Sequence, residues 1–88
     1  MSGFKILLRE SAERDCKKIN PQYTQKIFKK IEALGHNPRP PGCQKLVSTE
    51  KTYRIRIGDY RVLYQIDDKE KSILISYVRH RKDVYRSR

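Results

Sequence analysis

The sequence predicts one α+β domain over residues 1-88, in which an N-terminal strand and a two-helix hairpin pack on an antiparallel β-sheet. Apolar residues recur at helical spacing before Gly35, and with a period of two from Tyr53 onward. Because the helices come first and most strands later, the order favours two packed layers. A chain of 88 residues is long enough for one such domain with a modest core.

A short apolar run, Phe4–Leu8, predicts a first strand, which we expect at an edge of the sheet or beside the last strand. The charged segment that follows carries an apolar stripe at helical spacing, formed by Leu8, Ala12, Cys16 and Ile19. This stripe predicts a short amphipathic helix that ends near Ile19. Ser11 or a neighbouring residue can cap its start, because a hydroxyl oxygen accepts a free backbone N–H of the first turn.

Asn20-Pro21 predicts the start of a second helix, with Asn20 as the N-cap and Pro21 in the first helical position. The apolar stripe of this helix consists of Tyr23, Ile27, Phe28, Ile31 and Leu34. Gly35 and the following Asn37-Pro38 end it. We expect the two helices to pack as an antiparallel hairpin. The proline-rich residues 37–42 then predict a stiff crossover to the sheet.

A hairpin is predicted at the centre of the sheet, with Tyr53–Ile57 and Tyr60–Ile66 joined by Gly58-Asp59. A two-residue turn with glycine first favours type II′, whose twist matches that of the strands. This turn pairs Ile57 with Tyr60, Arg56 with Arg61, Ile55 with Val62, Arg54 with Leu63, and Tyr53 with Tyr64. Ser72–Val78 predicts the last strand, after an acidic turn at residues 67–70, and Gln44–Val47 predicts a short strand or edge segment.

The predicted pairing places Arg54, Arg56 and Arg61 on the face of the hairpin opposite its apolar residues. Arg56 and Arg61 then oppose each other directly, and like charges in that position repel. A bound anion would offset the repulsion, since guanidinium groups bind phosphate oxygens through paired donors. A solvated basic face is the alternative. Arg79 joins these arginines only if the strand parity is right, because a slip of one residue moves a side chain to the other face.

The charge balance indicates a polyanionic partner. Lysine and arginine number 21 against 10 acidic residues, and the formal net charge of +11 favours nucleic acid, an acidic protein or an anionic membrane surface. No apolar run approaches the roughly 18 residues of a membrane span. The N-terminus is too short and polar for a signal peptide, so we expect a cytoplasmic protein without a membrane partner.

Cysteine and histidine are sparse in this chain. Cys16 and Cys43 make no disulfide framework and are expected to be free thiols. The two histidines and two cysteines are dispersed, and the sequence contains no glycine-rich phosphate loop. The sequence therefore predicts neither a metal site nor a cofactor.

The C-terminal stretch Tyr77–Arg88 is densely basic and contains an aromatic residue, which is typical of an RNA-binding surface or of a solubilising tail. With the hairpin arginines it forms a cation-rich set that could cleave RNA without a metal. The ribose 2′-hydroxyl attacks the adjacent phosphorus, and fixed positive charge stabilises the transition state. Arginine is a poor general base because its pKa lies above about 12, so His80 is the candidate for proton transfer.

The stretch from Tyr53 to Tyr64, followed by the one from Val78 to Tyr85, resembles the RelE/ParE superfamily of toxins, and most closely its RelE branch. Asn37–Leu46 before the sheet also fits, so the resemblance spans nearly the whole chain. It implies an α+β toxin that is neutralised by a cognate antitoxin. RelE members enter the ribosomal A site and cut mRNA there by metal-free 2′-hydroxyl attack, leaving a cyclic phosphate and a 5′-hydroxyl.

The resemblance also implies roles for individual residues. Arg61 matches the arginine that stabilises the transition-state phosphate, Arg79 matches a second arginine, and Tyr85 matches a tyrosine that orients the substrate. Arg54 and Arg56 match basic residues that are lysines in the best-known member, where a lysine is the proposed base. The implied catalytic residues are Arg56, Arg61, Arg79 and Tyr85. The basic residues that we expect to bind RNA are Arg54, Lys45, Lys51, His80, Arg81 and Lys82.

Three functions remain open at this point. The first is a ribosome-dependent mRNA endonuclease of the RelE type, with the antitoxin, mRNA and the 70S ribosome as partners, and operator DNA through the toxin–antitoxin complex. The second is a ParE-like toxin that inhibits DNA gyrase by binding. The third is a basic RNA-binding module without toxicity. The arginine set together with Tyr85 favours RNA cleavage.

Overall fold

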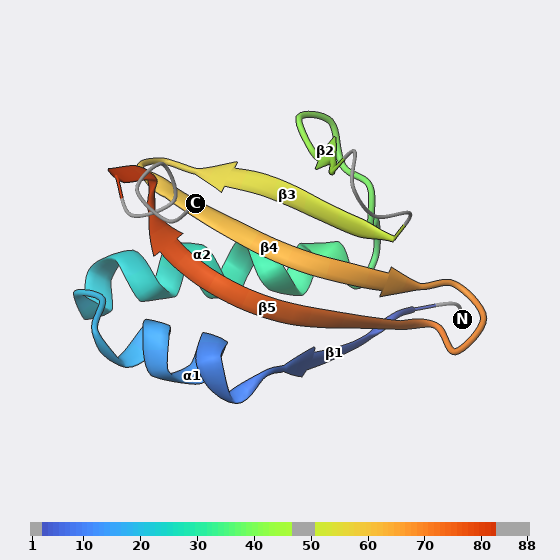
Figure 1. Ribbon diagram of the computed structural model, residues 1–88, viewed down its shortest axis with the longest axis horizontal. Helices are drawn as coiled ribbons and strands as arrows, with labels where there is room; N and C mark the ends of the chain where they lie inside the picture. The colour runs from blue at the N-terminus through green and yellow to red at the C-terminus, as the bar shows by residue number, and fades with distance from the viewer. Residues whose placement is uncertain (1–2, 47–50, 83–88) are drawn as a thin grey trace.

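A computed structural model describes residues 3–46 and 51–82 of the chain. Its elements are β1 (Lys5–Leu8), α1 (Glu10–Lys17), α2 (Pro21–Leu34), β2 (Gln44–Lys45), β3 (Thr52–Ile57), β4 (Tyr60–Asp67) and β5 (Ser72–His80). The strands form one five-stranded sheet in the order β1-β5-β4-β3-β2, and α2 lies behind it in Figure 1. The predicted α+β fold is confirmed. None of the helices in the described ranges is long and apolar enough to cross a membrane.

The central hairpin has the predicted register at all five pairs, from Ile57 opposite Tyr60 to Tyr53 opposite Tyr64. Gly58 has a φ of +61°, and Asp59 does not share the positive φ. That combination fits the first and second positions of a type II′ turn. The pairs β2–β3, β3–β4 and β4–β5 are antiparallel, whereas β1 runs parallel to β5 at the edge. The first strand therefore lies both at an edge and beside the last strand.

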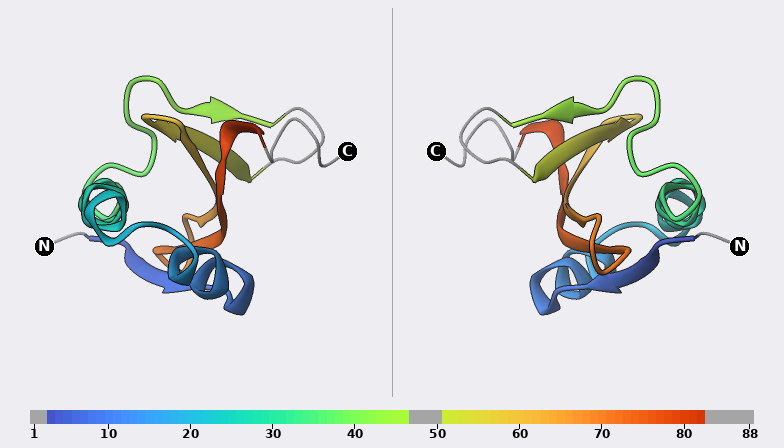
Figure 2. Two further views of the ribbon diagram at one scale, coloured as in Figure 1. Left: turned by 90° about the vertical axis from the view of Figure 1, so that its left-hand side faces the viewer. Right: turned by 90° about the vertical axis from the view of Figure 1, so that its right-hand side faces the viewer.

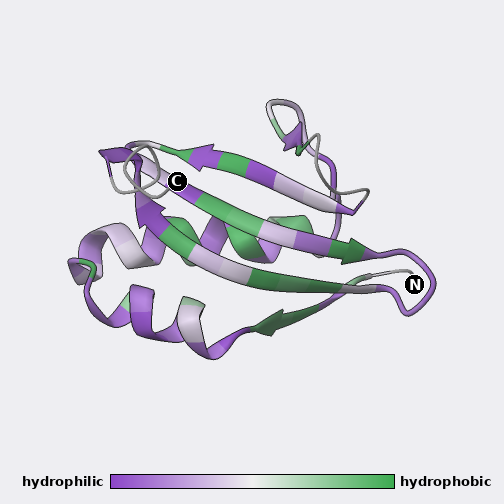
Figure 3. Cartoon of the chain, viewed as in Figure 1, coloured by the Kyte–Doolittle hydropathy of each residue, from purple (hydrophilic) through white to green (hydrophobic). Residues whose placement is uncertain are grey.

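The core lies between the sheet and α2. Figure 3 shows apolar residues along β3, β4 and β5 and on α2. The buried hydrophobic residues are Ala12, Ile27, Ile31, Leu34, Tyr53, Ile55, Val62, Tyr64, Ile66, Ile73, Ile75 and Val78. Those on β3, β4 and β5 project from one face of the sheet, so the core occupies that face.

The two helices differ in how they begin. At α2, the side-chain oxygen of Asn20 accepts the N–H of Gln22 at 3.1 Å and Pro21 occupies the first turn, as predicted. At α1, the N-cap is Arg9, which makes no side-chain capping bond within the described residues. The predicted cap by Ser11 is wrong, because Ser11 Oγ donates instead to the carbonyl of Ser76 at 2.7 Å. The helix ends at Lys17, two residues before Ile19.

Helix α1 extends the edge of the sheet where β1 stops. β1 pairs with β5 only over Ser72–Ile75. Beyond that point α1 packs against β5, as the two views of Figure 2 show. Side chains of α1 form hydrogen bonds there with backbone groups of β5. Ser11 donates to the carbonyl of Ser76, and Asp15 accepts the N–H of Val78 at 3.0 Å. The two helices thus have different places: α2 covers the face of the sheet and α1 covers its edge.

The proline-rich crossover between α2 and β2 is tied to the sheet by polar contacts. Arg39 donates to both carboxylate oxygens of Asp68, at 2.8 and 3.3 Å, and through Nε to the hydroxyl of Tyr53 at 3.1 Å. The buried hydroxyl of Tyr64 donates to the carbonyl of Pro38 at 2.8 Å. β2 is limited to Gln44–Lys45, and Val47 lies outside the described residues. Both Cys16 and Cys43 are free, as predicted.

Candidate nucleic-acid interface

Three arginines lie side by side across the three longest strands. Arg61 of β4 is the Cα partner of Arg56 on one side and of Arg79 on the other. Directly paired residues project to the same face of a sheet. Since Ile55, Val62 and Val78 are buried on the α2 side, these arginines occupy the opposite face. We call Arg56, Arg61 and Arg79 the arginine row.

A β-bulge brings Arg79 into the row. The register between β4 and β5 shifts between Leu63 and Tyr64, so that Tyr64 pairs with Ile75 while Leu63 pairs with Tyr77. Ser76 is the extra residue. Without this shift a regular alternation from Ile75 would place Arg79 on the buried face. The sequence left open the face of the sheet on which Arg79 lies. The bulge within β5 determines this face, and the turn before β5 does not.

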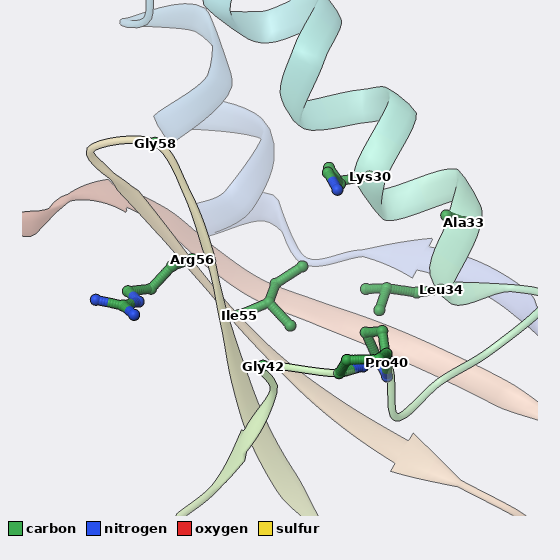
Figure 4. A pocket seen from close by; sticks show the side chains of 9 residues that line it. Lys30, Ala33, Leu34, Pro40, Gly42, Ile55, Arg56 and Gly58 are labelled. Carbon is green, nitrogen blue, oxygen red and sulfur yellow. The ribbon is translucent and has the colours of Figure 1, made fainter.

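The members of the row differ in exposure. Arg56 is exposed, and in Figure 4 its guanidinium points away from the side of β3 that carries Ile55. Arg61 is only 6% exposed, and its Nη1 donates to the carbonyls of Gly58 at 3.3 Å and Tyr60 at 3.2 Å. The central guanidinium is therefore held against the hairpin turn, in a fixed position between its two neighbours.

Arg79 is held by two other side chains. Its Nε lies 3.7 Å from Oδ2 of Asp15 on α1. Its guanidinium carbon lies 4.4 Å from the centroid of the Tyr77 ring, a distance at which a cation is attracted to the ring face. Neither Asp15 nor Tyr77 was singled out as a site residue from the sequence. Asp15 could have been noticed as an acidic residue that falls on the same helical side as Ala12 and Cys16.

Arg54 extends the cationic face along β3. It pairs with Leu63 and so shares the face of the row, and its Nη2 donates to Oε1 of Gln44 at 3.2 Å. Arg81 lies at the hairpin turn, where its Nε is 3.8 Å from Oδ1 of Asp59 and its N–H donates to the carbonyl of Asp59. Lys82 follows it and is exposed. These residues place further positive charge beside the row.

The other predicted site residues lie elsewhere. His80 pairs with Tyr60 on the α2 side, with the two rings 5.4 Å apart edge to face, and its Nδ1 accepts the N–H of Lys82 at 3.2 Å. Lys45 pairs with Tyr53, also on the α2 side, and Lys51 lies by Gln65 and Asp67 at the far end of β3. The structure does not bring these three to the row. Tyr85 lies outside the described residues.

A groove that the sequence did not predict lies beside β3. Its volume is about 460 Å³, and Figure 4 shows it between α2, the proline-rich crossover and the edge of β3. Lys30 and Arg56 lie among its lining residues, with Leu34, Pro40 and Ile55 forming its apolar part. β2 pairs with Tyr53 and Arg54 of β3, and the next residues of this strand, Ile55 and Arg56, line the groove.

The arrangement suits the binding and stabilisation of phosphate. Adjacent members of the row are roughly 4.5–5.5 Å apart at Cα, so that two guanidinium groups can bind one phosphate group. The three guanidinium groups supply positive charge and hydrogen-bond donors but no proton acceptor. In the two described ranges, no group of three or more His, Cys, Asp or Glu side chains is placed to hold a metal ion.

Comparisons with known proteins find similar sequences and chains of the same fold. A family model described as ParE toxin of type II toxin-antitoxin system, parDE, matches residues 6–85. Toxin RelG of Mycobacterium tuberculosis is 30% identical over 84 residues, which cover 94% of this chain and 97% of RelG. A chain of the toxin-antitoxin complex RelBE2 of the same organism has 27% identity and a TM-score of 0.78, over 89% of this chain and 98% of that one. A chain of the RelE-RelB complex of Pyrococcus horikoshii OT3 has the same fold, with a TM-score of 0.80 at 24% identity over 92% and 97% of the two chains.

Proposed function

Because this chain belongs to the RelE/ParE family of toxins of type II toxin–antitoxin systems, we propose that it is a ribosome-dependent endoribonuclease that cuts mRNA in the A site. The observation that carries the proposal is the arginine row. Arg61 is opposed by Arg56 on one side and by Arg79 on the other. Like charges in these positions are unfavourable for folding, but together they favour the binding of phosphate.

The proposed reaction is a transfer within the RNA backbone. The ribose 2′-hydroxyl gives up its proton and its oxygen attacks the adjacent phosphorus. The bond to the 5′-oxygen of the next nucleotide breaks and that oxygen takes up a proton, so that a cyclic phosphate and a 5′-hydroxyl remain. Arg61 stabilises the extra negative charge on the phosphate, Arg79 binds the phosphate or the leaving oxygen, and Arg56 and Arg54 bind the flanking backbone. Tyr85 orients a base or ribose.

The row itself supplies charge and orientation and no proton acceptor. Arginine does not lose its proton in the physiological range. His80 is on the other face of the sheet, next to Tyr60. The proton of the 2′-hydroxyl is therefore accepted by a group outside the row, and this protein contributes mainly by stabilising the transition-state charge.

The proposed partners follow from the family and from the charge. The RelBE2 complex contains a toxin together with its antitoxin, and we propose a RelB-type antitoxin for this chain. An acidic or amphipathic antitoxin segment complements the net charge of +11 and would cover the cationic face. The complex of the two proteins is expected to bind operator DNA, and the free toxin is expected to act in the cytoplasm, where mRNA and 70S ribosomes are present.

The test uses a reconstituted 70S ribosome programmed with a defined mRNA, and maps cuts by primer extension. Arg61→Ala is compared with Lys29→Ala, which removes one positive charge from an exposed position on α2. We expect an A-site cut that needs the ribosome, persists in Lys29→Ala and disappears in Arg61→Ala. Circular dichroism of each variant checks that the fold is retained.

A different result would assign another function to this chain. If no cut appears on the ribosome and gyrase supercoiling is inhibited in a parallel assay, the arginine row is a protein-binding surface of a ParE-like toxin. If neither activity appears and overexpression is harmless, the non-toxic RNA-binding module is correct. Naked RNA treated with EDTA serves as the control for cleavage without the ribosome.

A further inference from the structure

We propose that Asp15 of α1 is a positioning residue for Arg79, and that it orders this arginine for phosphate binding at the cost of some attraction for the substrate. The inference rests on the proposed function, because it names a residue that acts on the same site. Asp15 lies on a different element from the arginine row and reaches it across the edge of the sheet.

One carboxylate oxygen of Asp15 makes both contacts. Oδ2 accepts the backbone N–H of Val78 at 3.0 Å and lies 3.7 Å from Nε of the neighbouring Arg79. The Asp15 side chain is 18% exposed and that of Arg79 is 37% exposed, so the pair is partly shielded from water. Because the N–H of Val78 fixes the carboxylate relative to β5, the position of the negative charge next to Arg79 is fixed as well.

Tyr77 holds the same guanidinium from its own strand. Arg79 and Tyr77 are two residues apart on one face of β5, and the guanidinium carbon is 4.4 Å from the ring centroid. The contact with Asp15 is at Nε, which leaves the two terminal nitrogens for a ligand. A free arginine side chain samples many rotamers, and ordering it before the substrate arrives removes that entropic cost from the transition state.

The same carboxylate also has an opposing effect. A negative charge beside Arg79 lowers the local positive potential and so weakens the binding of a phosphate. Removing the charge should therefore loosen Arg79 and lower the catalytic rate while leaving substrate binding equal or tighter. An aspartate that only docks α1 onto the sheet would not act in this way. Its loss would lower the stability of the fold without lowering kcat selectively relative to KM.

The chain offers two matched controls. Ser11→Ala removes the other side-chain hydrogen bond from α1 to β5, which goes to the carbonyl of Ser76 and does not touch Arg79. Glu13→Gln makes the same charge change as Asp15→Asn at an exposed position of the same helix. In Asp15→Asn the amide oxygen of the new side chain can still accept the N–H of Val78, so this change removes the charge and keeps the backbone contact.

The experiment measures kcat and KM for A-site cleavage on programmed 70S ribosomes. Asp15→Asn is expected to lower kcat about tenfold with KM unchanged or lower, while Ser11→Ala and Glu13→Gln stay within about twofold of the unchanged protein. An unchanged kcat in Asp15→Asn would overturn the inference. So would an equal loss in Ser11→Ala, because the effect would then come from the docking of α1.

A second measurement separates this inference from the proposed function. The Nε–H resonance of Arg79 is followed by NMR in the free protein, where no ribosome is involved. Asp15→Asn should broaden it or move it towards the position of a solvent-exposed arginine, and Ser11→Ala should not. If the protein does not cleave but the resonance responds, the proposed function fails while the positioning of Arg79 holds. If the protein cleaves and the resonance does not respond, the positioning role is wrong.

Discussion

Arg56 and Arg61 face each other directly across the β3–β4 hairpin, with no residue between them in the ladder. Two like charges in that position destabilise the fold by a few tenths of a kcal/mol up to about 1 kcal/mol. Arg56→Gln is therefore expected to raise the stability to denaturant by about that amount and to lower A-site cleavage. Urea unfolding at low and high salt checks the first effect, since salt screens the repulsion.

The matched control for this change is Arg54→Gln. Arg54 lies on the same strand and face but opposes Leu63, and it is bonded to Gln44. Its replacement should not stabilise the protein. Equal stabilisation by both changes would mean that the net charge of the domain, and not the opposed pair, is responsible.

Gly58 provides a test of how the hairpin turn holds Arg61. A Cβ at Gly58 would meet nothing within 4 Å, so Gly58→Ala costs only the strain of a φ of +61°, about 1 kcal/mol. Gly42, with a φ of +93° and equally open surroundings, gives a control of similar cost in the crossover. Because Nη1 of Arg61 binds the carbonyl of Gly58, Gly58→Ala should reduce cleavage more than Gly42→Ala at equal stability.

The buried hydroxyl of Tyr64 is expected to make the fold less stable at alkaline pH. Burial raises the pKa of its hydroxyl, which donates to the carbonyl of Pro38. A raised folded pKa means that the stabilisation is complete below the unfolded value of about 10 and is lost as the pH rises above it. Tyr64→Phe should cost about 1–2 kcal/mol at neutral pH and flatten the alkaline fall of Tm. The exposed Tyr23→Phe should do neither.

The ion pair of Asp68 with Arg39 is expected to make the fold less stable at acid pH. Its hydrogen bonds from Arg39 lower the pKa of the carboxyl, and the folded value therefore lies below the unfolded one of about 3.9. The contribution to stability is present above that pH and is lost as the pH falls through the folded pKa. Asp68→Asn should lower Tm near neutral pH and reduce its dependence on pH below about 4. Glu32→Gln, at an exposed position of α2, should leave the dependence unchanged.

Local sequence signals were sufficient to predict those parts of the fold that depend only on residues close together in the chain. The glycine at position 58 fixed the turn and hence the register from Ile57–Tyr60 to Tyr53–Tyr64, and Asn20-Pro21 fixed the start of α2. The opposition of Arg56 and Arg61 followed from that register alone. Two of the three members of the arginine row were therefore predictable without any tertiary information.

Contacts between distant parts of the chain were not predictable in the same way. Ser11 has the residue type of a helix cap, but its hydroxyl bonds to Ser76, 65 residues away. The bulge at Ser76 decides the face of both Arg79 and His80, and two-residue periodicity does not allow for an extra residue. A sequence signal was present: Ile73 and Ile75 are spaced by two, whereas the next buried residue, Val78, is spaced by three.

The arginine row is distributed over three consecutive strands, and this distribution determines the stage of translation at which the site can form. Arg79 belongs to β5, which is the last strand of the described residues, and within these residues β1 near the N-terminus pairs with β5 alone. A nascent chain emerges N-terminus first, so the hairpin can form while β1 still lacks its partner. The three guanidinium groups come together only after β5 has left the ribosome and inserted between β1 and β4. The order of translation thus delays the assembly of the proposed toxic site until almost the whole domain has been made.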